Sequence, residues 1–150
     1  MDVEYAGITA AELAAGTAIL ALEATSQDIK TVTDALPVLT ETGGTLTASA
    51  AEQNVYVNNA PAGVYEPICV DIDFTNQTAT ETTIIREYKR IRTGGALILN
   101  DVPVTYAGVV ADPKVRTVTL LPNRFGVAVT LECSVSGTFR DYDWSTSYKE

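Results

Sequence analysis

The feature that most constrains the fold is a change in hydrophobic period near Thr45. From there on, apolar and polar residues alternate along short runs, which is typical of half-buried antiparallel strands. Turn-forming pairs such as Gly94-Gly95 and Asp112-Pro113 separate the runs. The expected strands span residues 45–49, 54–58, 64–74, 82–92, 96–99, 102–109, 115–121, 126–134 and 138–144. Strands at this spacing, without helices between them, predict a mainly β fold: an antiparallel β-sandwich or jelly roll of about eight strands.

The segment 125–144 shows the clearest alternation. Its first run places Val127, Val129 and Leu131 on one face. Ser136 and Gly137 follow, and a tight hairpin turn needs two such small residues. We therefore expect a closing β-hairpin here, against which the rest of the sandwich packs.

The second run of this segment carries Arg140, Tyr142 and Trp144 on one face. Two interpretations remain open. The three side chains could form a surface patch on which a ligand stacks. Alternatively, the Tyr and Trp rings fill the end of the core and keep only their polar atoms in water.

Residues 1–40 are rich in Ala and Thr and follow a different repeat. Apolar residues recur every seven positions, with small or apolar residues three positions later, and this predicts a helical arm with a heptad seam. The seam residues are Ile8, Ala15, Leu22, Ile29, Val32 and Leu36. We expect the arm over residues 1–40 and the sandwich over residues 41–150, with the Thr/Gly-rich stretch 40–45 separating them. Thr25 could also cap a second helix and divide the arm in two.

A helix with one narrow apolar seam cannot bury that seam by itself. The seam could be an interface between copies of the chain, or the helix could lie across the sandwich of its own chain. We favour the first interpretation, because the stretch 40–45 separates the seam from the strands. The expected oligomer is a closed trimer, with a pentamer or hexamer as the alternative.

Composition argues against several functional classes. The 150 residues carry a net charge of −9, and phosphate binding needs a cationic surface, so nucleic acid is not an expected partner. The sequence contains no histidine, so a Ser-His-Asp or Cys-His arrangement cannot be built. No glycine pattern resembles a phosphate-binding loop. We therefore expect a protein that is not an enzyme and has no cofactor.

The amino-terminal region lacks the marks of a membrane or secretion signal. The apolar stretch 6–24 is interrupted by Glu12 and Glu23, so we expect no membrane span. The first cationic residue is Lys30, so we also expect no signal peptide. Cys69 and Cys133 fall on different sides of their strands, which predicts two free thiols.

Four of the ten cationic residues gather in one expected strand. They are Arg86, Lys89, Arg90 and Arg92. This cluster could contact an acidic neighbour across a subunit interface. It could instead pair across strands with acidic residues of the same chain, such as Asp71, Asp73 or Glu87.

Asp71 and Asp73 alternate on one face of another strand. Two carboxylates on one face could bind Ca²⁺ or act as an acid/base pair. The alternative is that they form the solvated side of an amphipathic strand. The sequence leaves these interpretations open.

Several short motifs together point to a known class of proteins. They are the segments 34–37 (DALP), 44–48 (GTLTA), 84–88 (IIREY), 125–131 (FGVAVTL) and 137–144 (GTFRDYDW). With them the chain resembles small decoration or turret-like structural proteins of tailed bacterial and archaeal viruses, which have a helical N-terminal arm and a C-terminal β-sandwich. The resemblance implies a virion protein, assembled in the host cytoplasm, that packs on the particle surface. Its implied partners are copies of itself and the major capsid or other virion proteins.

Two other functional classes remain as alternatives. A jelly-roll module could recognise a glycan or receptor through aromatic side chains, although a fold by itself does not give a function. The candidate aromatic residues are Tyr56, Tyr65, Tyr106, Tyr142 and Trp144. An enzyme that uses Asp71 and Asp73 is the third class.

Overall fold

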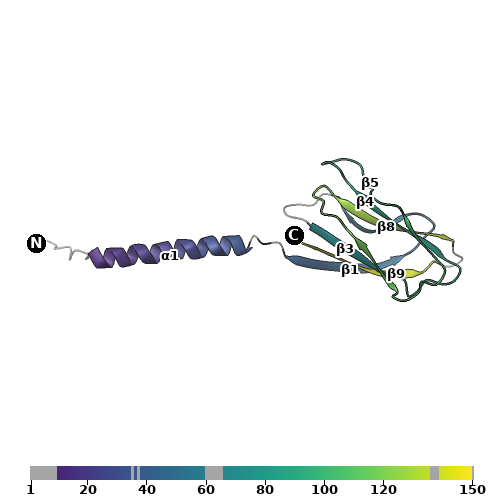
Figure 1. Cartoon of the computed structure of the whole chain (residues 1–150), viewed down its shortest axis with the longest axis horizontal. Coiled ribbons are helices and arrows are strands. Elements are labelled where there is room, and N and C mark those ends of the chain that lie inside the picture. The colour runs from purple at the N-terminus through teal and green to yellow at the C-terminus, as the bar shows by residue number, and fades with distance from the viewer. Residues whose placement is uncertain (1–9, 35, 37, 60–65, 136–138, 150) are drawn as a thin grey trace, which may run out of the picture. The chain divides into compact units, whose positions relative to one another are not determined.

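The structure is a computed structural model that describes residues 10–34, 36, 38–59, 66–135 and 139–149. The chain divides into two compact units, Met1–Leu36 and Pro37–Glu150. The first unit contains a helix and the second contains only strands within its described part (Figure 1). The predicted fold class, a mainly β sandwich preceded by a helical arm, is confirmed.

The helix α1 spans Ala10–Asp34 without interruption. At the position where a second helix could have begun, Thr25 Oγ1 donates a hydrogen bond to the carbonyl oxygen of Ala21 (2.9 Å). Ser26 Oγ bonds in the same way to Leu22 O (2.9 Å). These hydroxyl groups bond back to the preceding turn instead of capping a new helix, so the described part of the arm is a single helix. The seam residue Ile8 lies outside the described residues.

Nine strands are described in the second unit. They are β1 (Leu39–Thr47), β2 (Gln53–Asn58), β3 (Glu66–Asp73), β4 (Thr82–Lys89), β5 (Ile98–Leu99), β6 (Val104–Ala107), β7 (Val115–Thr119), β8 (Val127–Val135) and β9 (Asp141–Lys149). Each lies within or overlaps a segment that the period-two alternation predicts.

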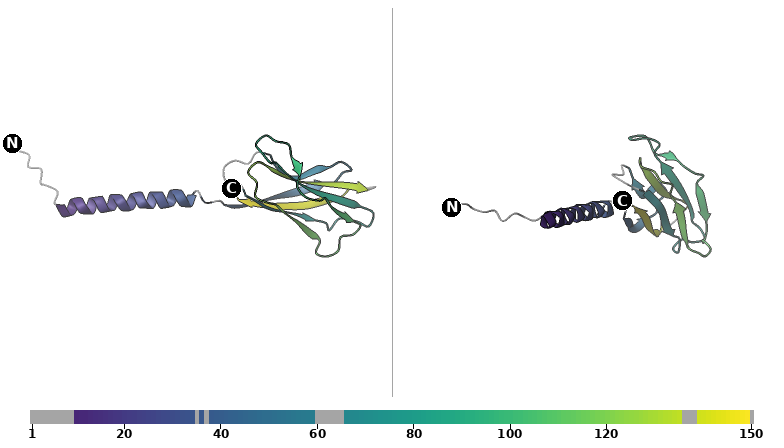
Figure 2. Two further views of the ribbon diagram at one scale, coloured as in Figure 1. Left: turned by 45° about the horizontal axis from the view of Figure 1, so that its top comes forward. Right: turned by 60° about the vertical axis from the view of Figure 1, so that its left-hand side comes forward.

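The strands form two antiparallel sheets that face each other (Figure 2). One sheet has the order β1-β9-β3-β7, and the other has the order β2-β8-β4-β5, with β6 also paired to β4. Apart from the steps from β4 to β5 and β6, the chain changes sheet at each new strand. This repeated crossing is the wrapping of a jelly-roll-like sandwich.

The predicted hairpin over 125–144 is wrong. β8 pairs with β2 and β4, whereas β9 pairs with β1 and β3 in the opposite sheet. Ser136 and Gly137 lie outside the described residues. Alternation shows which face of each strand is apolar, but it is equally compatible with a hairpin and with a connection that crosses between sheets.

The expected separator 40–45 is also wrong, because these residues belong to β1, which pairs with β9 from Leu39↔Lys149 to Thr47↔Asp141. Gly43 lets the backbones of β1 and β9 approach closely, because it has no side chain. A Cβ atom there would lie 2.5 Å from the carbonyl oxygen of Trp144. The weak apolar pattern of a Thr/Gly-rich edge strand made it resemble a linker.

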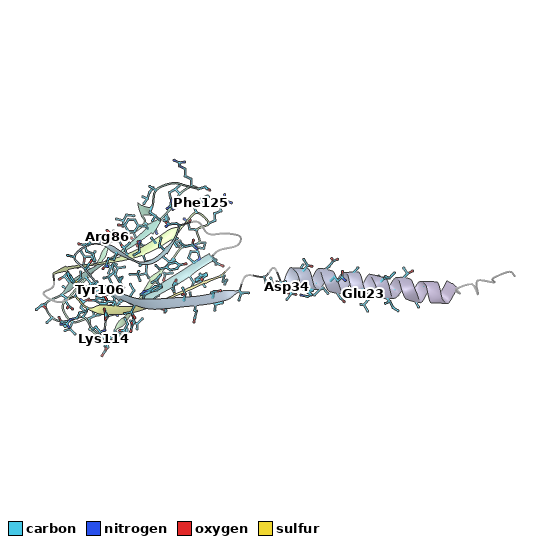
Figure 3. The ribbon with its side chains drawn as sticks, turned by 180° about the vertical axis from the view of Figure 1, so that it is seen from behind. Glu23, Asp34, Arg86, Tyr106, Lys114 and Phe125 are labelled. Carbon is cyan, nitrogen blue, oxygen red and sulfur yellow. The ribbon has the colours of Figure 1, made fainter. Side chains whose placement is uncertain are left out.

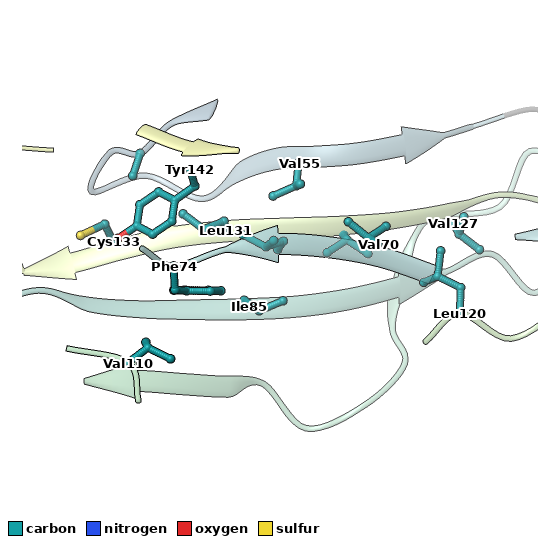
Figure 4. Packing of buried hydrophobic residues seen from close by; sticks show 13 residues of the cluster. Val55, Val70, Phe74, Ile85, Val110, Leu120, Val127, Leu131, Cys133 and Tyr142 are labelled. Carbon is teal, nitrogen blue, oxygen red and sulfur yellow. The ribbon is translucent and has the colours of Figure 1, made fainter. Parts of the chain in front are cut away.

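The core lies between the two sheets. Val70 and Ile72 of β3 and Phe74, the residue after it, extend into this space, and Val129 and Leu131 meet them from β8. Phe74, Tyr142 and Cys133 gather at one end of the core (Figure 4). As predicted, Cys69 and Cys133 are not joined by a disulfide.

Candidate functional site

The seam of α1 consists of exposed apolar side chains. Leu22, Ile29 and Val32 are 68%, 61% and 66% exposed, and Leu36, just beyond the helix, is 60% exposed. Ala15 is exposed as well. Burying one Leu or Ile side chain contributes roughly 1.5–3 kcal/mol. The seam is therefore an apolar surface that gains free energy from a partner.

The apolar surface of α1 is broader than the heptad pattern predicts. Ile19 and Leu20 lie outside the seam and are 64% and 67% exposed. Polar residues recur regularly in the second half of the helix, among them Lys30 and Asp34, which form an i,i+4 ion pair (2.5 Å). The amino-terminal half therefore offers apolar side chains on more than one side. This signal was visible in the sequence but falls outside a strict seven-residue repeat.

The side chain of Arg86 pairs with Glu132 of the neighbouring strand β8 and with Glu52, the residue before β2. Its Nη1 atom lies 2.8 Å from Glu132 Oε2 and 3.3 Å from Glu52 Oε2. Glu52 Oε1 also accepts hydrogen bonds from Tyr88 Oη (2.7 Å) and Thr130 Oγ1 (2.6 Å). Arg86 is labelled in Figure 3. Its charge is balanced within the chain, by partners other than the Asp71, Asp73 or Glu87 proposed from the sequence.

The other predicted cations do not form one surface with Arg86. The guanidinium of Arg90 donates to Asn59 Oδ1 (2.9 Å) and to the carbonyl oxygen of Gly95. Lys89 is partly exposed at the end of β4, and Arg92 is exposed in the turn beyond it. The structure therefore separates these four residues into different local environments.

The predicted patch of Arg140, Tyr142 and Trp144 is not an open aromatic surface. Tyr142 is 1% exposed, and its ring packs edge-on against Phe74 with the centroids 5.4 Å apart. Trp144 is half-buried beside Tyr56, with the centroids 6.3 Å apart. A ligand patch that includes Tyr142 is wrong, because a buried ring cannot stack on an external ligand. The alternative interpretation is confirmed in that both rings pack on the core. Its expectation that their polar atoms stay in water is wrong for Tyr142, whose hydroxyl is buried 3.2 Å from Thr83 Oγ1.

Asp71 and Asp73 lie on the outer face of their sheet, away from the core. Thr117 Oγ1 donates to Asp71 Oδ1, and Thr75 Oγ1 donates to Asp73 Oδ1 (2.6 Å). Hydrogen bonds from the hydroxyl and backbone N–H of Thr75 hold the pKa of Asp73 below its ordinary value. In the described part of the chain, no three His, Cys, Asp or Glu side chains are grouped in a way that could hold a metal ion.

A cavity of about 270 Å³ opens at the side of the sandwich. It lies where β4 and β6 of one sheet face β7 of the other. Its apolar wall consists of Ile85, Val102, Val104 and Val118, and its polar lining includes Glu87, Asp101, Tyr106 and Arg116. The sequence does not point to this cavity, because its residues come from strands whose pairing partners cannot be read from the alternation of apolar and polar residues.

Among the residues that the structure describes, no helix has the length and apolar character needed to cross a membrane. No family model matches this chain, and no curated protein matches it either.

Proposed function

We propose that this protein is a non-enzymatic structural protein of a virus particle, a capsid decoration, turret or similar accessory protein. It assembles through α1 and presents its sandwich as the folded unit. The observation that carries the proposal is the row of exposed apolar side chains on α1, from Ala15 through Leu22 and Ile29 to Val32. The jelly-roll-like sandwich agrees with this proposal but does not distinguish it from a binding module, because viral capsid proteins and lectins both use this fold.

The assembly step has a direct physical basis. Side chains at positions 22 and 29 are seven residues apart, so they lie on the same side of the helix and can meet the same residues of a second copy. Burying both in each copy would contribute about 3–6 kcal/mol per chain before the entropy of association is subtracted. A trimer is the proposed oligomer.

The first experiment measures native mass by light scattering for the full chain and two double variants. The first variant, Leu22→Gln with Ile29→Gln, makes two apolar positions of the seam polar, and we expect it to be a monomer. Ala24→Gln with Thr31→Gln is the matched control, because these positions lie about 200° around the helix from the seam. The control should keep the mass of the unaltered chain. A monomeric unaltered chain, or equal effects of both pairs, would contradict assembly through the seam.

The second experiment tests the proposed location. Particles purified from a culture that produces the protein should contain it at a constant ratio to the major capsid protein, measured by mass spectrometry. The seam variant should be reduced on these particles, and the control variant should not. Recovery of the protein only in the particle-free fraction would contradict a virion role.

A further inference from the structure

The cavity at the side of the sandwich has one acidic end. Along β4, Glu87 lies on the same face as Thr83 and Ile85, which point into the sandwich. Asn100 Nδ2 donates to Glu87 Oε1 (2.7 Å), and the backbone N–H of Asn100 donates to the carbonyl oxygen of Glu87 (2.8 Å). The Asn100 amide thus occupies one carboxylate oxygen and leaves Oε2 available to a ligand.

The electrostatic environment at this end is negative. Burial raises the pKa of Glu87 above its ordinary value, the hydrogen bond from Asn100 opposes this rise, and the charge of Asp101 adds to it. The charge of Lys89 lowers the pKa of Glu87, but its effect is the smallest of the four. A poorly solvated carboxylate beside a second carboxylate gains free energy from a cation that reaches both.

Arg116, a cationic residue that lines the cavity, lies at the end opposite Glu87. The guanidinium carbon of Arg116 is 5.5 Å from the centre of the Tyr106 ring, and Tyr106 is paired with Thr83. Thr83 and Glu87 are four residues apart on β4, or about 13 Å. The Arg116 guanidinium donates to the carbonyl oxygens of Pro113 and Ala111, so it is held against the segment that precedes β7.

The wall between the two ends is apolar and open to solvent. Val104, paired with Ile85, is 49% exposed, and Val102 is 79% exposed. Val118 of β7 faces them from the opposite sheet. A ligand that fills the cavity therefore needs an aliphatic chain to pack against this wall. It also needs a cationic group to pair with the carboxylates at the acidic end.

We propose that this cavity binds a primary alkylammonium group, with the ammonium against Glu87 and Asp101 and the aliphatic chain along Ile85, Val104 and Val118. The same chemistry is offered by a lysine side chain of a partner protein and by a free aliphatic polyamine. The site belongs to the sandwich alone and does not depend on assembly through α1.

The test is a titration of the full, isotope-labelled chain followed by amide NMR shifts. Hexylammonium should give saturable shifts at residues of β4, β6 and β7 around the cavity. Hexan-1-ol, with the same chain length and no charge, should bind at least about tenfold more weakly, because a hydrogen-bonded charge accounts for that difference. The Glu87→Gln variant should weaken hexylammonium by a similar factor, since Gln keeps the acceptor for Asn100 but not the charge.

The control variant is Asp143→Asn, which removes a carboxylate from the outer face of the other sheet and should leave the affinity unchanged. Equal binding of hexan-1-ol, an unchanged affinity in Glu87→Gln, or shifts confined to the face that carries Asp143 would each overturn the proposal. Two further ligands identify the source. Tighter binding of Nα-acetyl-lysine N-methylamide supports a lysine side chain, and tighter binding of 1,5-diaminopentane supports a free polyamine.

Discussion

Arg140 and Glu81 form an ion pair of very unequal exposure. Arg140 Nε lies 3.0 Å from Glu81 Oε1, and the Glu81 side chain is 2% exposed while that of Arg140 is 41% exposed. Glu81 Oε2 accepts a second bond from the backbone N–H of Thr78 (2.7 Å). The pair connects the loop before β4 to the residue that precedes β9, so it joins the two sheets at one end of the sandwich.

Removing the cation from this pair should destabilise the fold. We expect Arg140→Gln to lower the free energy of unfolding by about 1–3 kcal/mol, because the buried Glu81 carboxylate loses its countercharge. Urea denaturation measures this change. The control is Lys149→Gln, whose pair with Glu66 is exposed on both sides (43% and 45%) and should contribute less than about 1 kcal/mol. Equal effects of the two variants would contradict the role of burial.

The Tyr142 hydroxyl group lies in a buried polar cluster, 3.2 Å from Thr83 Oγ1 and 3.4 Å from Gln77 Oε1. Tyr142→Phe should cost about 1 kcal/mol of stability near neutral pH. Thermal unfolding of the single variants and of the double variant with Thr83→Val measures the coupling between the two hydroxyls. Additive effects would show that the hydroxyls do not interact.

Alkaline pH gives a second test of Tyr142. Burial raises the pKa of its phenol, partly opposed by the hydrogen bond with Thr83. The unfolded chain therefore loses this proton first, near pH 10, and stability should fall as the pH rises from there through the folded-state pKa. Tyr142→Phe should make the decline shallower in denaturation at about pH 9–11. The decline should not vanish, because burial also raises the pKa of Tyr88.

Gly126 has a backbone conformation that side chains rarely adopt. Its φ is 132°, and a Cβ atom there would lie 2.7 Å from the carbonyl oxygen of Asn58. We expect Gly126→Ala to lower the unfolding free energy by about 1–3 kcal/mol. Gly16→Ala is the control, because nothing lies within 4 Å of that Cβ and Ala favours a helix by about 0.5–1 kcal/mol. A neutral Gly126→Ala would contradict the strain at this position.

The cluster around Arg86 predicts a pH-dependent defect. Burial tends to raise the pKa of Glu52, but hydrogen bonds from Thr130 and Tyr88 and the charge of Arg86 together lower it below its ordinary value. Arg86→Met should reduce stability by about 1–3 kcal/mol near neutral pH, because Glu52 and Glu132 then repel without a cation. The difference from the unaltered chain should shrink at acidic pH, as the pH falls through the lowered pKa of Glu52 and that carboxylate protonates. A difference that stays constant with pH would show a packing effect alone.

Much of the local structure could be predicted from residue patterns. The alternation of Val127, Val129 and Leu131 correctly identified the core face of β8, and the heptad pattern identified α1. These predictions hold because periodicity is a local property of the chain. The prediction that β8 is only half-buried is wrong, because Ala128 and Thr130 on its other face are buried as well. The boundaries of β1 and β9 were less accurate. β1 is a Thr/Gly-rich edge strand that buries few apolar side chains, and the segment 145–149 of β9 carries Ser and Thr residues instead of an apolar alternation.

The candidate sites depended on contacts that no local pattern records. Arg86 and Glu132 are 2.8 Å apart only because β4 and β8 pair with Ile84 opposite Glu132. In the same way, Glu87 faces a cavity because β7, from the other sheet, lies across the opening from β6. Clustered charges in the sequence point to Arg86 and Asp71, but no local pattern points to the side cavity.

Residue order is enough to predict the types of element, a helix followed by strands, and the apolar face of each, because the two periods of about 3.6 and 2 are properties of consecutive residues. Which strands are neighbours depends on contacts that form only in the folded chain. β8 and β9 follow each other in the chain yet lie in opposite sheets, because both sheets must bury their apolar faces at once and the best pairing depends on residues far apart in sequence. That pairing placed Tyr142 in the core and left the side cavity open beside Glu87.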